Sequence, residues 1–434
     1  MNTFIAISII LLSILGTPLF VIFGIVSILC YHSTPDMSLP LMAVEINKLA
    51  TSNFSVLVAI PLLTFSGYLL AEGKTPERLI NLGKTWLGWM PGGLAWMGIF
   101  ICAAFTVFTG ASGVTIIALG GLLLPIMVRH GYPEKTAVGL ITTCGSVGLM
   151  FFPALPLIIY SIPSGANIDQ LKVAGILPGA LIIFLLGTYT TFVTLRSNWK
   201  PSAFKLKEAG RALWEAKWEI PIIVIIILAF RKGGITVNEV PLVISFYIFI
   251  KEIFICRDIS FFRDVPRIAR QSMALVGAIF MVFALALVFT NYLVDRQVTS
   301  HIFDWISPYI TSKWIFLLAL NIFLLVVGSM MDIYSALAVV VPLIMPISNK
   351  YGIDPLHLGM IFLTNLEIGY LHPPVGLNLF LSSIRFKRSL VQLYKDTFPF
   401  LILLIIALLL ITYVPELSLY LVKKGPSLTA ITSP

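Results

Sequence analysis

Residues 331–380 read MDIYSALAVVVPLIMPISNKYGIDPLHLGMIFLTNLEIGYLHPPVGLNLF, a stretch in which apolar runs alternate with helix breakers. An apolar run at 335–347 ends near Pro346 and Gly352, and a second run at 357–382 is interrupted by Gly369 and Pro374. The first run is shorter than the roughly 20 residues that a spanning helix needs. Since it closely follows another apolar run at 314–330, we expect a re-entrant helical hairpin, followed by a helix that is broken inside the membrane.

The same helix breakers recur in the first half of the chain. Pro125 and Pro346 are 221 residues apart (346 − 125), and this offset also relates Gly131 to Gly352, Gly148 to Gly369, Pro153 to Pro374, and Thr143 to Thr364. An internal repeat is therefore predicted, with copies that begin near residues 92 and 313. The short apolar run at 113–128 becomes part of a first hairpin.

The composition of the chain is that of a membrane protein. Of its 434 residues 58% are hydrophobic and 11% are charged, whereas a soluble domain carries about 25% charged residues. The net charge of +9 lies in short stretches between apolar runs, which favours a topological role over binding of nucleic acid. The four cysteines form no CxxC pair, so we interpret them as packing residues.

Hydropathy outlines the predicted spans and their sidedness. The first apolar stretch is too long for a signal peptide, so it is interpreted as a retained membrane helix. Three basic stretches, at 196–217, 251–270 and 385–395, are expected in the cytoplasm, the mixed stretch at 292–313 in the periplasm, and 33–54 along the interface. The candidate segments are 3–31, 55–71, 92–109, 113–128, 136–160, 174–195, 217–230, 238–255, 271–294, 314–330, 335–347, 357–382 and 398–415.

Counting the crossings relates the two repeats to each other. If 92–128 is a hairpin without a net crossing, five crossings separate it from the second hairpin. An odd number inverts the second repeat and also places the three basic stretches on one side. Inverted repeats with broken helices and a midplane site are a recurrent design of secondary transporters. The expected units are 1–91 (N-terminal scaffold), 92–195 (first transport repeat), 196–312 (scaffold and connections), 313–397 (second transport repeat) and 398–434 (C-terminal helix and tail).

Unwound backbone in a membrane survives only where it is buried in protein or lines a polar cavity, so the tips and breaks are the candidate site. The tips are 108–113 and 328–332. The breaks are 145–148 with 152–156, and a second one that includes Asn365, Gly369 and 372–376. Candidate residues of the substrate cavity are Gly110, Ser146, Pro153, Glu367, His372, Pro374 and Asn378.

Asp332 is the only acid between Lys313 and Lys350, and an intramembrane carboxylate is by default a functional candidate. It could instead be a structural partner of hairpin amides. Hard oxygen ligands of the kind sodium prefers are available from Thr109, Ser112, Thr143 and Asn365, although such side chains also form interhelical hydrogen bonds. Glu367 could relay protons, coordinate an ion or pair with an arginine, and His372 could contact substrate or cap a helix. No paired histidine spacing predicts a transition-metal site.

At these residues the sequence resembles the large membrane subunit of TRAP (tripartite ATP-independent periplasmic) transporters. The matching stretches are FTGASGVTIIALGGLLLPIMVRHGYP, GLMFFPALPLIIY, AGILPGAL, GGITVNE and, most strongly, residues 331–380. The first break departs from the family's Pro-Pro-Ser-x-Pro at residues 152–156, and His372 stands where the family usually has threonine.

The resemblance implies an all-α, multi-pass protein of the bacterial inner membrane, with an elevator-type, ion-transporter-like fold and no enzymatic activity. It also implies sodium as the coupling ion, with sites near Thr109, Ser112, Thr143, Asp332 and Asn365. The implied partners are a small four-helix membrane subunit and a periplasmic binding protein that delivers an organic acid. Two alternatives remain open, namely a stand-alone proton- or sodium-coupled elevator carrier and, remotely, an intramembrane enzyme.

Overall fold

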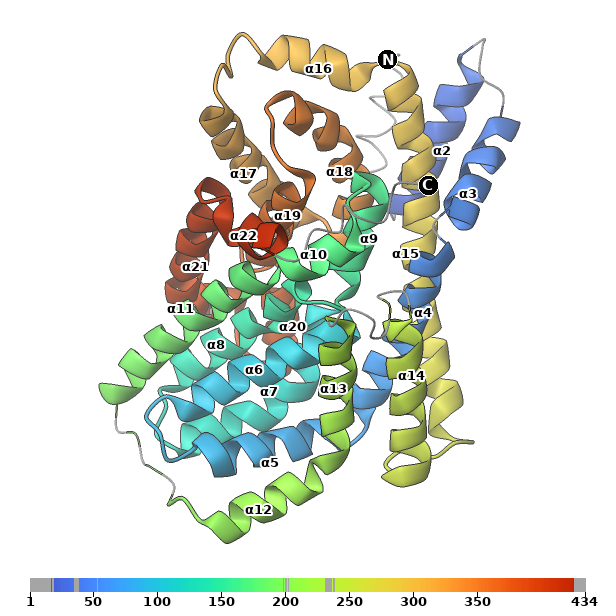
Figure 1. Ribbon diagram of the computed structural model, residues 1–434. Helices are drawn as coiled ribbons and strands as arrows, with labels where there is room; N and C mark the ends of the chain where they lie inside the picture. Colours follow the sequence, from blue (N-terminus) through green and yellow to red (C-terminus); the bar gives the residue numbers. More distant parts are fainter. Residues whose placement is uncertain are drawn as a thin grey trace.

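The computed structural model describes residues 17–424, apart from residues 18, 35–38, 53, 198, 200, 202, 231–235, 237 and 238. Its secondary structure over these residues is entirely helical (Figure 1). The elements before the first hairpin are α2 (Leu19–His32), α3 (Pro40–Ser52), α4 (Phe54–Glu72) and α5 (Thr75–Leu87). Most of the predicted first helix, residues 3–16, lies outside the described residues, and α2 forms its second half.

The first repeat contains α6 (Gly93–Thr109), α7 (Ser112–Arg129), α8 (Glu134–Val147), η1 (Gly148–Met150), α9 (Leu155–Ser164), α10 (Ile168–Ala174) and α11 (Ile176–Leu195). The connecting region contains α12 (Leu206–Glu215), η2 (Lys217–Glu219), α13 (Ile220–Ala229), α14 (Val240–Ile250), η3 (Lys251–Ile255), α15 (Asp264–Asp295) and α16 (Val298–Ile306). The second repeat and the C-terminal part contain α17 (Lys313–Met330), α18 (Ile333–Lys350), α19 (Pro355–Gly369), α20 (Leu377–Phe386), α21 (Leu390–Tyr413) and α22 (Glu416–Lys424).

Helix boundaries recur at the offset of the sequence repeat. Adding 221 to the bounds of α7 (112 and 129) gives 333 and 350, which are the bounds of α18. The same sum applied to α8 (134 and 147) gives 355 and 368, within one residue of α19. Cis peptide bonds precede Pro153 and Pro374. The inversion of one repeat relative to the other stays a prediction.

Six described helices, α10 and α11 counted as one, are long and apolar enough to cross a membrane, or up to eight if each bent pair is one span. The second helix of each hairpin was expected to be too short to span the membrane. This prediction was wrong, because α7 and α18 have 18 residues each. Pro125, and Pro342 with Pro346, lie inside these helices rather than at their ends. The two-residue links at 110–111 and 331–332 turn each helix pair into a hairpin.

Both predicted helix breaks begin later than the sequence suggested. Gly145 and Ser146 lie within α8, and Asn365 lies within α19. The glycines serve close packing instead, since a Cβ at Gly148 would lie 2.2 Å from the carbonyl oxygen of Ala103, and one at Gly369 would lie 2.4 Å from the carbonyl carbon of Gly328. The chain leaves the helix only at 151–154 and at 370–376.

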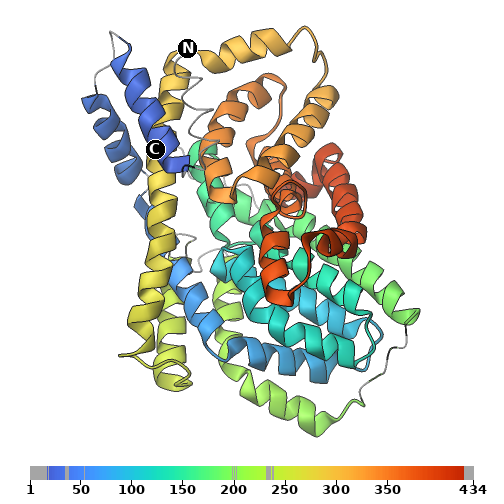
Figure 2. The ribbon, with the colours of Figure 1, turned by 180° about the vertical axis from the view of Figure 1, so that it is seen from behind.

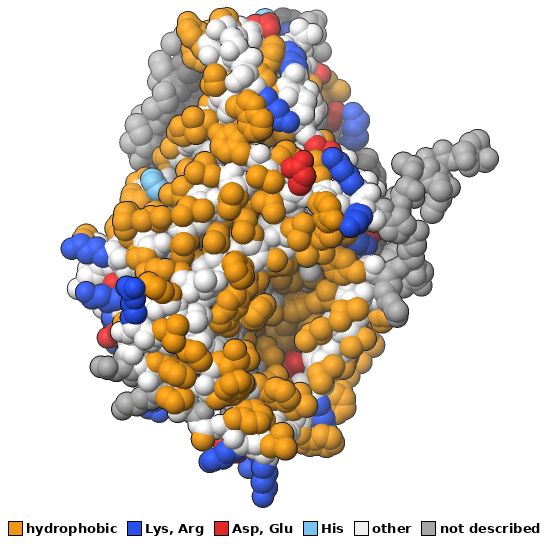
Figure 3. Space-filling view, turned by 60° about the vertical axis from the view of Figure 1, so that its left-hand side comes forward, with side chains coloured by type: hydrophobic (Ala, Val, Ile, Leu, Met, Phe, Trp, Pro, Cys, Tyr) orange, Lys and Arg blue, Asp and Glu red, His pale blue; other side chains and the backbone are white. Residues whose placement is uncertain are grey.

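The helices form two sides of the molecule. The long helix α15 stands beside α2, α3 and α4 on one side, whereas both hairpins and α19 to α21 occupy the other (Figures 1 and 2). One outer face is mostly hydrophobic, with basic side chains near its lower and left edges, as expected of a surface in contact with lipid (Figure 3). The predicted boundary at 397/398 falls inside α21, and the division into moving units stays a prediction.

Candidate functional site: a cavity between the hairpin tips and the scaffold

A cavity of about 380 Å³ lies where the two hairpin tips face α4 and α15. The first tip contributes Gly110, Ala111 and Ser112, and the second contributes Asp332 and Tyr334. Helix α15 supplies an apolar wall, and Tyr68 on α4 adds a polar edge. The lining is completed by Gly113, Val114, Ile117, Leu149, Leu275, Ala278, Ile279, Val282, Ile333, Tyr370, Leu377 and Leu381.

Tyrosine hydroxyls join the two tips and the second break. Tyr334 donates a hydrogen bond to the carbonyl oxygen of Gly110 at 2.6 Å, so a side chain of one hairpin holds the tip of the other. The hydroxyl of Tyr370 accepts the backbone N–H of Ile333 at 2.7 Å. Gly110 ends α6 with φ +62°, in the left-handed region that favours glycine. The tip carbonyl is therefore held in a fixed orientation.

The two tips differ in how their second helix begins. Asp332 is the N-cap of α18, and its Oδ2 accepts the backbone N–H groups of Tyr334 and Ser335, both at 3.0 Å. At the equivalent position of the first repeat (332 − 221) stands Ala111, and no side chain among the described residues caps α7. The N-terminus of α7, with its free N–H groups and partial positive charge, therefore borders the cavity.

The scaffold touches the first tip closely. A Cβ added to Gly67 on α4 would lie 2.4 Å from the Cα of Thr109 and 2.5 Å from the carbonyl oxygen of Phe108. Behind this contact, Thr106 donates to the carbonyl oxygen of Gly145 at 2.8 Å and lies 2.8 Å from the hydroxyl of Thr115. The first tip is thus clamped between α4 and α8.

Among the predicted site residues, Gly110, Ser112 and Asp332 line the cavity. Thr109 is buried behind the tip, where its hydroxyl donates to the carbonyl oxygen of Ala111 at 3.3 Å. Thr143 donates to the carbonyl oxygen of Gly139 within α8, at 2.8 Å. Neither threonine hydroxyl reaches the cavity lining. Their roles as sodium ligands stay predictions.

A second group of predicted residues lies along α8, α19 and α20. Asn378 donates to the hydroxyl of Ser146 at 3.3 Å and so joins α20 to α8. Asn365 donates to Oδ1 of Asn321 at 2.8 Å and therefore points toward α17. Both oxygens of Glu367 are buried without a hydrogen-bond partner among the described residues, and no arginine in that part of the chain is paired with this carboxylate.

Three predicted break residues, Pro153, His372 and Pro374, do not belong to the cavity lining, whereas Tyr370 of the second break does. Pro153 is buried, whereas Pro374 is exposed. The Nδ1 of half-buried His372 lies 2.6 Å from the carbonyl oxygen of its neighbour Pro373. Whether any of these residues contacts a solute stays a prediction.

The tyrosines of the cavity and the environments of Lys251 and Glu239 were not predicted from the sequence. Tyr334 and Tyr370 lie close to predicted site residues in the sequence, so their polar hydroxyls next to the tip and the break were an available signal. Lys251 was assigned to a basic loop, but its side chain is fully buried and ion-paired. In the motif GGITVNE, Oε2 of Glu239, the residue before α14, accepts the backbone N–H of Thr236 at 3.0 Å.

The fold is similar to those of two solved membrane transport proteins. The solved YdaH transporter of Alcanivorax borkumensis matches with a TM-score of 0.65 over 94% of this chain and 98% of that one, at 12% identity. The solved MtrF of Neisseria gonorrhoeae, described as one of a class of antimetabolite efflux pumps, matches with a TM-score of 0.57 over 91% and 93%, at 14% identity. At these identities the likeness shows the fold alone.

Sequence comparison then gives the family. The model described as "Tripartite ATP-independent periplasmic transporter, DctM component" matches residues 6–417, so the chain belongs to the large permease subunits of TRAP transporters. The C4-dicarboxylate TRAP large permease of Rhodobacter capsulatus is 31% identical over 84% of this chain and 86% of its own length. The corresponding Pseudomonas aeruginosa protein is 30% identical over 92% of both.

A third relative has a different named substrate. The isethionate TRAP transporter permease of Oleidesulfovibrio alaskensis is 30% identical over 94% of this chain and 64% of its own length. The predicted family, multi-pass inner-membrane location and transport role are confirmed, and the relatives are permeases rather than enzymes.

Proposed function

We propose that this permease takes up an organic acid by sodium symport, and that the solute binds in the cavity between the hairpin tips. The observation that carries the proposal is the charge of this cavity. Its lining contains one carboxylate, Asp332, and no lysine or arginine among the described residues. An anionic solute placed there would be repelled by Asp332, so a cation that binds between them would make binding of both favourable. A sodium ion supplies that charge.

The uncapped N-terminus of α7 is the proposed binding place for the solute's acidic group. Free backbone N–H groups and the partial positive charge of a helix N-terminus favour anions. The Ser112 side chain lies at the same tip and could donate a further hydrogen bond. Named relatives transport a C4-dicarboxylate or isethionate, and both solutes are organic anions. These names favour an acidic solute for this chain, with carboxylates and sugar acids as the first candidates.

The proposal includes partners and a movement. A small four-helix membrane subunit and a periplasmic binding protein, as the family description "tripartite" favours, would complete the transporter. Because the cavity lies between the hairpin tips and α4 with α15, sliding of the hairpins along these helices would carry the site across the membrane. We therefore favour an elevator mechanism over a fixed binding site.

Uptake into vesicles that contain the reconstituted three-part transporter tests the substrate class. Labelled C4-dicarboxylate, sulfonate and sugar-acid solutes should be compared with neutral analogues of the same size. Binding to the periplasmic partner, measured by calorimetry, identifies the solute first. Uptake of an acid, and competition only by other acids, is expected. Equal uptake of the neutral analogue would contradict the proposal.

A further inference from the structure

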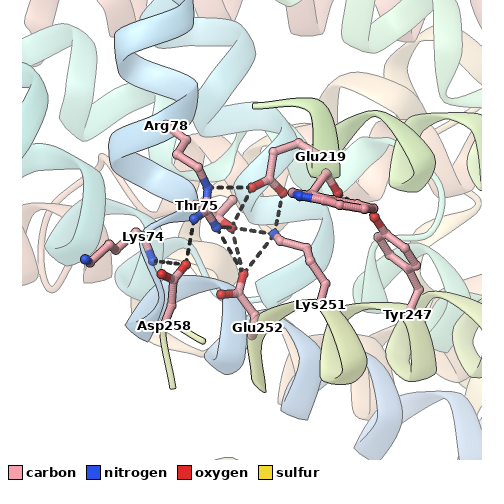
Figure 4. Close-up of polar contacts among 9 residues, drawn as sticks. Lys74, Thr75, Arg78, Glu219, Tyr247, Lys251, Glu252 and Asp258 are labelled. Carbon is pink, nitrogen blue, oxygen red and sulfur yellow. Dashed lines mark hydrogen bonds and ion pairs between the residues drawn. The ribbon is translucent and has the colours of Figure 1, made fainter. Parts of the chain in front are cut away.

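A cluster of buried charged side chains lies outside the cavity, where α4 bends into α5 (Figure 4). The two helices meet at an angle of 66°. The cluster joins the first turn of α5 to η2, which precedes α13, and to η3 and the loop that follow α14. Its members are Thr75, Arg78, Glu219, Lys251, Glu252 and Asp258. Lys251 and Glu252 are 0% exposed and Glu219 is 5% exposed.

The ammonium of Lys251 is at the centre of this cluster. It donates to the hydroxyl of Thr75 at 2.7 Å, pairs with Oε1 of Glu252 at 2.8 Å, and also pairs with Glu219. Thr75 in turn donates to Oε1 of Glu252 at 2.8 Å. Helix α5 is therefore connected to the carboxylates of Glu219 and Glu252 through the hydroxyl of Thr75, which also accepts a hydrogen bond from the ammonium of Lys251.

Arg78 makes the second connection from α5. Its Nε donates to Glu219 at 3.1 Å, and its Nη1 donates to Asp258 at 2.7 Å. The backbone at Gly73 packs tightly against Glu252, because a Cβ added to Gly73 would lie 2.5 Å from Oε2 of Glu252. Breaking a buried pair on one side leaves an uncompensated buried charge, so such a cluster holds one geometry strongly. The first turn of α5 is thus fixed to η2 and to the segment that follows α14.

The equivalent helix of the second repeat has no comparable anchor among the described residues. Subtracting 221 from the bounds of α16 (298 and 306) gives 77 and 85, which lie inside α5. Both helices lead from a scaffold helix into a hairpin. Within the part of the chain that the structure describes, no salt bridge involves α16. Phe303 packs on Tyr351, and the ammonium of Lys350 lies 4.0 Å from the centroid of the Phe303 ring, so α16 contacts the hairpin to which it leads. Helix α5 also packs on its own hairpin, because a Cβ added to Gly83 would lie 2.0 Å from Cγ of Met97 on α6. The difference between the two helices is therefore the ionic cluster.

The far end of α5 is built for a change of direction. The turn at 88–92 connects α5 to α6, and Gly92 has φ +77°, a left-handed conformation that favours glycine. Its Cβ position would lie 2.2 Å from the Thr191 hydroxyl, so no larger residue fits. Helix α5 therefore has an ionically fixed beginning and a glycine turn at its end.

We propose that this cluster keeps α5 fixed to the scaffold throughout transport, so that movement of the first hairpin is taken up at the 88–92 turn and, in the second repeat, by α16. The inference rests on the proposed elevator movement. The two connecting helices, α5 and α16, then move differently during transport. Helix α5 extends the scaffold, and α16 travels with its hairpin. Arg78 and Lys251 act as positioning residues far from the solute.

Distances between spin labels test this directly in the reconstituted transporter. In a chain whose native cysteines are replaced by serine, one pair joins Lys84→Cys on α5 to Ser260→Cys in the scaffold. A second pair joins Lys135→Cys on α8 to Ser260→Cys. All three positions are exposed. With and without sodium and solute, the first distance should stay constant while the second shifts.

The possible outcomes distinguish failure of the α5 anchor from failure of the elevator movement. A first distance that shifts together with the second overturns the anchor and leaves the elevator intact. If neither distance shifts, the elevator movement itself is contradicted. This comparison needs no change in the cluster, so it stands even if cluster variants fail to fold.

A substitution within the cluster then tests whether these residues hold α5 to the scaffold. Lys251→Met should broaden the distribution of the first distance and lower uptake by about tenfold or more. The matched control is Arg267→Gln, which breaks the exposed ion pair with Glu72 (3.0 Å, side chains 41% and 40% exposed) near the same bend. The control should change neither quantity. A folded Lys251→Met chain with an unchanged narrow distribution would remove the cluster from this role.

Discussion

Asp332 combines two roles that the sequence could not separate. It caps α18 through two backbone N–H groups, and it also contributes the only carboxylate that the described residues give to the cavity lining. The cap alone would justify an aspartate at this position, since it satisfies N–H groups that the helix leaves free. The proposed coupling role needs the negative charge as well. A substitution that keeps the cap and removes the charge therefore distinguishes the two roles.

Asp332→Asn should insert and fold like the wild type, because asparagine caps helices about as well as aspartate. Its uptake should fall strongly, and the sodium concentration needed for half-maximal uptake should rise. Asp332→Ala should lose uptake too and additionally lose about 1 kcal/mol of stability with the cap. Sodium titration of uptake and thermal unfolding in detergent measure these effects. Normal sodium dependence in Asp332→Asn would leave only the capping role.

Tyr334 should matter for solute binding through its hydrogen bond to the first tip. Tyr334→Phe removes a bond of about 0.5–1.5 kcal/mol, so we expect the KM for uptake to rise by roughly 2- to 12-fold at a normal protein level. The control is Tyr351→Phe, which breaks a similar bond to the carbonyl oxygen of Ile310, at 2.7 Å and outside the cavity lining. Equal effects of the two substitutions would show that Tyr334 has no special link to the site.

At the scale of helices, the contact between α4 and the first tip is a backbone contact that only glycine permits. Gly67→Val should lower uptake at least tenfold, because a side chain there would displace the tip at Thr109. Gly277→Ala on α15 is the matched control, since its Cβ would meet nothing within 4 Å and alanine favours a helix by about 1 kcal/mol. Uptake assays at equal protein levels compare the two variants with the wild type. An active Gly67→Val transporter would contradict tight packing of the tip in this state.

The elements that could be predicted from the sequence are those with a strong local signal. Apolar runs located the long apolar helices but not shorter helices such as α5, α12 and α16. The offset of 221 residues between the helix breakers was enough to relate α7 to α18. The helix breaks were misplaced because Gly145 and Gly369 look like breakers, although in the structure they serve close helix packing. The burial of Lys251 was missed for a different reason. Its partner Glu219 lies 32 residues away, and local hydropathy carries no information about such a pair.

At the scale of the whole molecule, the charged loops make a prediction about sidedness. In a chain without its native cysteines, Lys205→Cys and Lys387→Cys should react only with thiol reagents that reach the cytoplasmic side. Asp304→Cys on α16 should react from the periplasm. All three side chains are exposed. Inside-out and right-side-out vesicles provide the comparison, and labelling of Lys205→Cys from the periplasm would overturn the orientation.

We propose that a sodium gradient drives uptake of an organic acid through the cavity between the hairpin tips. The most direct measurement is uptake of the acid bound by the periplasmic partner, into vesicles that contain both membrane subunits, with and without an inward sodium gradient. We predict uptake against the solute's own gradient, loss of accumulation when potassium replaces sodium, and the same loss in Asp332→Asn. Accumulation that continues without sodium, in the wild type and in Asp332→Asn alike, would contradict sodium-driven uptake.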